Sequence, residues 1–199
     1  MPDTNLNNAA NVTAGKPKFT GSIFTAPIGT TAPTNESSAL AEGFDCMGFI
    51  SEDGLSHEIT RESEKVKEWG GQTVMTSQTE YEEKLTFTAL EMLNTDVLKV
   101  IFGEDNVTEA TGHRQTVGNA TELGDRMWVF DMVMSNGKAR RIFVPRGRIT
   151  SIGEISYKNN EAVSTELEVT AVPDESGNTS YTWDDVSTSS TNSSSGTGN

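Results

Sequence analysis

Few side chains of this sequence could carry out acid–base, nucleophilic or metal chemistry, and none stands in the pattern that such chemistry needs. The two histidines, His57 and His113, lie in separate polar segments, and Cys46 is the only cysteine. A zinc site needs several N or S ligands placed near each other. We therefore expect no metal site, two exposed histidines and a buried, inert thiol.

The acidic pairs and the paired glycines also fall short of a catalytic or phosphate-binding motif. Glycoside hydrolysis needs two carboxylates in one cleft, whereas adjacent strand residues such as Glu82-Glu83 point to opposite faces. The second acidic pair, Asp184-Asp185, has no cleft marked around it. Gly70-Gly71 lacks the lysine and the spacing of a phosphate-binding loop. The sequence predicts no catalytic residue, no cofactor and no enzyme.

Composition and charge exclude further classes of protein. The length of 199 residues favours one domain. Acidic residues number 29 against 15 basic ones, which gives a net charge of −14. Binding to nucleic acid through counterion release requires clustered lysine and arginine, so the charge argues against it. No apolar run approaches the ~20 residues of a membrane span.

Alternation of apolar and polar residues predicts a series of strands joined by turns. In the segment 163–171, for example, Leu167 and Val169 would face inward while Glu166 and Glu168 face outward. The polar stretch 55–79 is expected to be a long exposed hairpin or loop. Strands are expected at 19–25, 47–50, 81–90, 127–134, 139–144, 149–157 and 163–171, with turns at 51–54, 135–137 and 158–161.

One short segment changes to the helical period. Apolar residues recur there on one stripe, namely Leu93, Val97, Leu98 and Ile101. Asn94 or Thr95 could cap this helix, and Gly103 would end it. Strands and helix together predict a mainly β protein, an antiparallel β-sandwich or barrel with one flanking α-helix.

The ends of the chain differ in composition from its middle. Residues 1–18 are polar and rich in turn formers, and the last residues are only Ser, Thr, Asn and Gly. Such segments bury too little apolar area to offset their ordering entropy. We therefore expect a mobile arm at 1–18, the β domain at 19–173 and a flexible tail at 174–199.

An ordered set of motifs then resembles a known family. The set begins with Gly48-Phe49-Ile50-Ser51-Glu52-Asp53-Gly54-Leu55 and continues with Lys67-Glu68-Trp69-Gly70-Gly71, Thr79-Glu80-Tyr81, Leu85-Thr86-Phe87-Thr88, Leu90-Glu91, Asn94-Thr95-Asp96-Val97-Leu98 and Phe102-Gly103. In this order the motifs resemble the major tail protein, or tail tube protein, of long non-contractile-tailed bacteriophages. The resemblance covers roughly residues 43–103.

The resemblance implies an architecture, a function and partners. The fold would be the tail-tube β-sandwich, which is related to the tube protein of type VI secretion systems. Six copies would form a ring, and rings would stack into a tube that conducts DNA from capsid to host. The implied partners are other copies of the chain, the tape-measure protein in the lumen before ejection, a tail terminator and baseplate or distal tail proteins. DNA would pass in transit without specific binding, no membrane partner is implied, and the protein would assemble in the host cytoplasm into the virion tail.

On this resemblance the segment 55–79 corresponds to a long loop that contacts the neighbouring ring. We expect Trp69 to anchor that contact, because an exposed Trp in a polar loop is typical of an interface. The alternative is that Trp69 folds back onto its own sheet. The candidate ring-stacking residues are Glu58, Lys67, Trp69, Gly70 and Gly71.

A tube that passes DNA must not hold it, so acidic and hydroxyl side chains are expected to face the lumen. The first candidates are Glu166, Glu168 and Thr170, with Glu154 and Ser156 from the partner strand. The second candidates are Glu82 and Thr86. Either sheet could be the inner one, and these residues could instead lie on the exterior of the tube.

Two other functions remain open at this point. A different virion module, such as a capsid decoration or an immunoglobulin-like surface domain, would share the strands and the Thr-rich composition. It would not need the polar loop with Trp69 or the helix around Val97. A hydrolase acting on a polysaccharide would instead place a pair of carboxylates in a groove.

Overall fold

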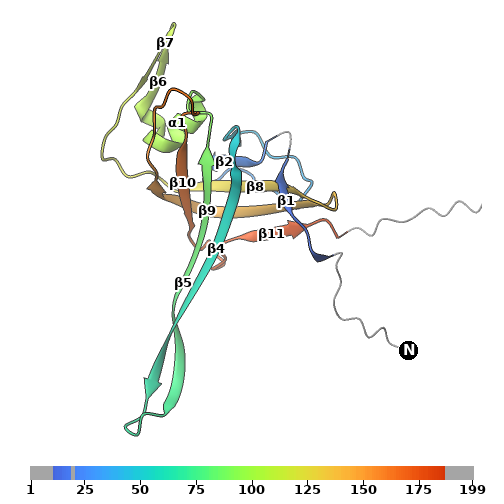
Figure 1. Ribbon diagram of the computed structural model, residues 1–199, viewed down its shortest axis with the longest axis vertical. Helices are drawn as coiled ribbons and strands as arrows, with labels where there is room; N and C mark the ends of the chain where they lie inside the picture. The colour runs from blue at the N-terminus through green and yellow to red at the C-terminus, as the bar shows by residue number, and fades with distance from the viewer. Residues whose placement is uncertain (1–10, 19–20, 187–199) are drawn as a thin grey trace, which may run out of the picture.

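The structure of this chain, a computed structural model, describes residues 11–18 and 21–186. This part of the chain is mainly antiparallel β-structure with a single α-helix (Figure 1), which confirms the expected fold class. The helix is α1 (Thr95–Phe102), followed by the 3-10 turn η2 (Glu104–Asn106). The strands are β1 (Gly15–Pro17), β2 (Ile23–Pro27), β3 (Asp45–Cys46), β4 (Ile50–Lys67), β5 (Thr73–Ala89), β6 (Val107–Ala110), β7 (His113–Thr116), β8 (Arg126–Met134), β9 (Ala139–Ile152), β10 (Thr165–Ala171) and β11 (Tyr181–Asp184).

Nine of the strands belong to one sheet, which folds over on itself through β9. The order is β3-β2-β8-β9-β10-β5-β4, with β1 beside β8 and β11 beside β9, while β6 and β7 pair separately. The first half of β9 pairs with β8 and β11, and its second half, from Gly147 to Ile152, pairs with β10. In Figure 1, β8 and β11 therefore run across the view, whereas β10, β5 and β4 run along its long axis.

The main core fills the space between the two parts of the sheet and is closed at one end by α1. Phe87 of β5 meets the edge of the Trp128 ring of β8 at 6.0 Å between centroids. Both side chains are almost completely buried. Gly147 is required at the crossing, because a Cβ there would lie 2.7 Å from Cδ1 of Trp128 and 2.8 Å from Cγ1 of Val169.

The helix forms as its sequence signals predict. The side chain of Asn94 caps it by accepting a hydrogen bond from the backbone N–H of Asp96 at 3.0 Å. Gly103 ends it with a φ of 101°, and its N–H donates to the carbonyl of Lys99 at 2.8 Å. Leu93 is the exception: it precedes the cap and is exposed, so its expected place on the apolar stripe is wrong.

Several of the expected strand boundaries are wrong. The segment 51–54 is a bulge within β4 and not a turn, because Ile50 faces Ala89 while Leu55 already faces Phe87. Residues 47–49 lie outside any strand. The segments 139–144 and 149–157 are not separate strands, since β9 runs unbroken from Ala139 to Ile152 and stops there.

Both of the expected terminal segments contain a short strand. Gly15–Pro17 pairs with the end of β8, so the expected arm holds a short strand. Tyr181–Asp184 pairs with β9, and Tyr181 and Trp183 stack around Phe143, so the expected tail also begins too early. Residues 1–10, 19–20 and 187–199 lie outside the described residues.

Candidate functional site

The face of β10, β5 and β4 that points away from the core is polar. In β10, Glu166, Glu168 and Thr170 alternate with Leu167 and Val169, which are fully buried. Cross-strand partners share a face of the sheet. The pairs on the outer face are Glu166–Thr88, Glu168–Thr86, Thr170–Lys84, Ser56–Thr86, Glu58–Lys84 and Thr60–Glu82. The structure thus brings Glu166, Glu168, Thr170, Glu82 and Thr86 together on one surface, the polar face.

The polar face is acidic. Among the six cross-strand pairs on it, Lys84 is the only residue with a positive charge. Its Nζ lies 3.3 Å from Glu82 and 3.6 Å from Glu168, and the hydrogen bond to Glu82 is the main cause that raises the pKa of Lys84. Glu58 and Glu166 add two further carboxylates. Arg148 of β9, opposite Thr170, is held by Asp125 at 2.6 Å and Glu122 at 2.5 Å.

Glu154 and Ser156 do not belong to this surface as strand residues. The last ladder bond is donated by the N–H of Gly153 to the carbonyl of Glu166 at 2.7 Å. The hydroxyl of Thr165 then donates to the carbonyl of Gly153 at 3.0 Å, so that carbonyl is occupied by a side chain. The chain leaves the sheet after Gly153. Glu154 and Ser156, which were expected on a strand beside β10, therefore lie in the connection between β9 and β10.

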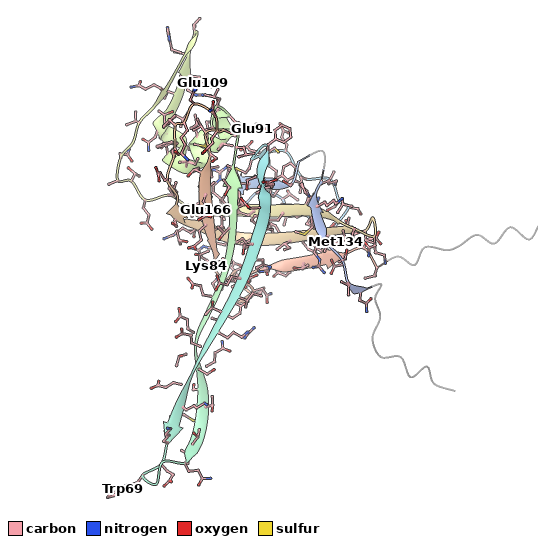
Figure 2. All side chains as sticks on the ribbon, viewed as in Figure 1. Trp69, Lys84, Glu91, Glu109, Met134 and Glu166 are labelled. Carbon is pink, nitrogen blue, oxygen red and sulfur yellow. The ribbon has the colours of Figure 1, made fainter. Side chains whose placement is uncertain are left out.

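The segment 55–79 forms the outer part of a long hairpin, the β4–β5 arm, which confirms the hairpin expected there. Its ladder runs from the Leu55–Phe87 pair to the Lys67–Thr73 pair. Figures 1 and 2 show the arm projecting away from the rest of the molecule, with Trp69 at its tip. Every residue of β5 from Thr73 to Tyr81 is exposed.

The tip of the arm is a tight turn that presents Trp69 to solvent. Glu68 and Gln72 are joined by a backbone hydrogen bond of 2.9 Å, and the N–H of Gly71 donates to the carbonyl of Glu68 at 2.9 Å. Gly71 has a φ of 90°, which L side chains rarely adopt. Trp69 is 103% exposed, so in this structure it does not fold back onto its own sheet.

The expected ring-stacking residues do not form one cluster. Lys67, Trp69, Gly70 and Gly71 lie together at the tip. Glu58 faces Lys84 near the base of the arm, eleven residues before Trp69 and therefore about 36 Å away along an extended strand. Glu58 belongs by position to the polar face.

A buried carboxylate lies at the base of the arm, with partners that the sequence did not indicate. Glu83 is 1% exposed and accepts hydrogen bonds from Ser180 at 2.7 Å, from Tyr81 at 3.1 Å and from Thr179. Nε2 of His57 lies 2.7 Å from the same carboxylate. Burial alone would raise the pKa of Glu83, but the hydrogen bonds from Thr179, Ser180 and His57 outweigh it and lower the pKa.

Of the expectations about reactive side chains, the one for Cys46 is corrected. His57 and His113 are both exposed, as expected, although the side chain of His57 is only one-quarter exposed beside Glu83. Cys46 is half-buried rather than buried. Within residues 11–18 and 21–186, no three His, Cys, Asp or Glu side chains are grouped so that they could hold a metal ion. In the same part of the chain, no helix has the length and apolarity to cross a membrane.

The chain combines a mainly β fold with a long hairpin arm and an acidic sheet face. A comparison of its sequence with known families then decides to which family it belongs. A family model described as phage tail tube protein matches residues 4–193. The chain belongs to the phage tail tube protein family. This confirms the family that the motifs of the sequence indicated, and it makes the tail tube protein a structural component of a phage tail. No curated protein matches its sequence.

Several solved structures are similar to this tail tube protein at low sequence identity. One is the cap that terminates the tube of the anti-feeding prophage, with 10% identity and a TM-score of 0.46 over 92% of this chain and 98% of that one. Another is the sheath–tube complex of PVC, an extracellular contractile injection system, in its extended state, with 8% identity, a TM-score of 0.45 and coverages of 81% and 87%. The sheath/tube terminator of the same system has 9% identity, a TM-score of 0.39 and coverages of 84% and 96%.

Proposed function

We propose that this tail tube protein forms hexameric rings that stack into the tube of a long non-contractile tail, and that DNA passes through this tube from capsid to host. The observation that carries the proposal is that the sheet has two open edges on either side of its polar face. β4 ends the strand order on one side. On the other side β9 pairs with β8 only up to Gly147, so among the described residues Arg148–Ile152 pairs with β10 alone.

Open edges of this length need a partner. Unpaired N–H and C=O groups along an edge strand are a template for another strand, and closing a sheet into a barrel removes them. Pairing β4 of one copy with the Arg148–Ile152 edge of the next would extend β9, β10, β5 and β4 into a continuous ring. The polar face would then line the bore, and the main core would lie behind it.

An acidic lining suits the passage of DNA. Glu58, Glu82, Glu166 and Glu168 outnumber Lys84 on this face, and Thr86 and Thr170 add hydroxyl groups. Carboxylates repel phosphates, whereas a lysine or arginine lining would bind them by releasing counterions. The polymer would therefore slide through the lumen without being retained there.

The β4–β5 arm supplies the contact between rings, with Trp69 as its anchor. The remaining partners of the proposed tube are the tape-measure protein in the lumen before ejection, a terminator at one end and baseplate or distal tail proteins at the other. Assembly would take place in the host cytoplasm, and the protein has no enzymatic step to perform in this role.

Electron microscopy of the concentrated protein tests this proposal. Negative-stain images should show hollow rings with sixfold symmetry, or filaments built from them. A protein that stays monomeric at every concentration, with solid particles in the images, would contradict it. The variant Trp69→Ala separates the levels of assembly, because it should weaken stacking while leaving the sheet edges that close the ring unchanged.

A further inference from the structure

A groove of about 470 Å³ lies at the start of β4, between β1 and the bulge at 51–54, with the end of β8 as its floor. Its volume lies within the range of pockets that bind drug-sized molecules. Apolar side chains that line it include Ile23, Ile50, Leu55, Phe130, Met132 and Met134. We propose that this groove receives the Trp69 tip of the arm of a second copy in the adjacent ring, an inference that rests on the proposed stacking of rings.

The groove and Trp69 lie at opposite ends of the same strand. β4 has 18 residues, so its start and its end are about 60 Å apart at ~3.3 Å per residue. In Figure 1 this strand begins in the body near β1 and runs out to the tip of the arm. A projection at one end and a recess at the other make a head-to-tail contact, which propagates from copy to copy into a filament.

The lining of the groove matches the chemistry of an indole ring. Trp69 exposes its whole side chain, and such rings dominate interface energetics once they enter a pocket. The sulfur atoms of Met132 and Met134 lie 3.5 and 3.7 Å from the position that a Cβ of Gly15 would occupy, so both reach the β1 side of the groove. Thioethers adapt their shape to a ligand and make favourable contacts with aromatic rings.

Two carboxylates on the rim of the groove and two lysines on the tip form possible ion-pair partners. Glu52 and Asp53 are exposed on the rim of the groove, and Lys65 and Lys67 lie on the tip just before Trp69. The tip also carries Glu68 and the groove wall carries Lys16, so the match is between the first four side chains and not between net charges. In the described part of the chain none of these four side chains forms an ion pair.

The other acidic group of the groove is already neutralised. Asp131 accepts two hydrogen bonds from Arg141, at 2.6 and 2.7 Å, and both side chains are buried. The rim therefore supplies the negative charge that faces an incoming tip, and the lysines of the tip would meet it there.

Cysteine cross-linking in assembled tubes tests the placement directly. Cys46→Ser removes the lone thiol, Gln72→Cys labels the tip without altering Trp69, and Lys16→Cys labels the β1 side of the groove. A short bismaleimide should convert tubes of this double-cysteine chain into a ladder of covalent multimers. Moving the second cysteine to Glu175, in the exposed turn before β11, should abolish the ladder.

A charge exchange tests the specificity of the contact. Glu52→Lys alone and Lys67→Glu alone should each raise the protein concentration needed for tube formation roughly two- to fivefold, as expected when an exposed ion pair is replaced by repulsion. The double variant restores the opposite charges and should assemble near the wild-type concentration.

The outcomes separate this inference from the proposed function. Tubes that form normally but give no tip-to-groove ladder, with no rescue in the double variant, would overturn the inference and leave the stacked-ring proposal standing. Wild-type protein that forms no rings or tubes would overturn both.

Discussion

The two halves of β5 lie in opposite environments although they form one continuous strand. From Glu83 to Ala89, alternate residues are buried in the main core, and Phe87 is only 2% exposed. From Thr73 to Tyr81, every residue is exposed, and the pairing strand β4 is exposed as well. The body is thus stabilised by burial of its own apolar residues, whereas the arm is a two-stranded ribbon that is at best marginally stable by itself.

This difference indicates separate roles for the body and the arm. A ribbon that buries nothing within its own chain contributes little to folding, yet this one presents Trp69, Val74 and Met75 to solvent. Exposed apolar side chains on a projecting element are typical of a contact with another molecule. We therefore expect changes in the body to alter stability, and changes in the arm to alter assembly.

The largest effect on stability is expected in the body. Phe87→Ala removes a buried ring that contacts Trp128 and Phe130, and should lower the free energy of unfolding by about 3–5 kcal/mol. Val74→Ala, in the exposed half of the same strand, is the matched control and should change it by no more than about 0.5 kcal/mol. Urea denaturation of both variants measures the difference; equal losses would abolish the distinction between body and arm.

A smaller effect is expected where the arm joins the body. Glu83→Gln removes the charge that Thr179, Ser180 and His57 satisfy, and should cost about 1–3 kcal/mol. The folded protein lowers the pKa of Glu83, so its contribution to stability is present above the pKa of the unfolded chain. That contribution is lost as the pH falls through the folded pKa.

The measurement for Glu83 is thermal unfolding as a function of pH. Wild-type protein should lose stability on acidification below the ordinary range of a glutamate, and Glu83→Gln should show less of this loss. Hydrogen exchange at His57 and Tyr81 should also become faster in the variant. A wild-type pH profile in Glu83→Gln would show that the cluster does not hold the base of the arm.

The smallest effect on stability is expected on the polar face. Glu166→Lys with Glu168→Lys changes outward side chains and should alter the free energy of unfolding by no more than about 0.5 kcal/mol. Tubes should still form, but a basic lining would bind phosphates and slow DNA ejection from reconstituted particles. The matched control, Glu166→Gln with Glu168→Gln, removes the charges without adding cations and should slow ejection less. Normal ejection from the lysine variant would place this face outside the lumen.

Local patterns were enough to predict several elements of this fold. The alternation in β10 placed Leu167 and Val169 inward and Glu166 and Glu168 outward, as the structure has them. Asn94 and Gly103 marked the helix because capping depends on neighbouring residues only. The polar hairpin around Trp69 was likewise indicated by the segment itself.

Features that depend on distant residues were missed. Asp53-Gly54 has the composition of a turn, and only the pairing of β4 with β5 makes the segment a bulge, with Gly54 at a φ of 74°. Thr179 reaches Glu83 across 96 residues, and Tyr181–Asp184 becomes a strand only because β9 offers an edge. No spacing within the sequence predicts such contacts, because they form only when the sheet folds over on itself.

The central claim, that the arm serves contacts between copies, is tested most directly by Trp69→Ala. Its effect should be measured as the concentration at which tubes sediment, beside the thermal unfolding of the unassembled protein. We predict an unchanged unfolding temperature and an assembly concentration about 30-fold higher, as expected for a hot spot worth ~2 kcal/mol. Tubes that form at the wild-type concentration would contradict the account.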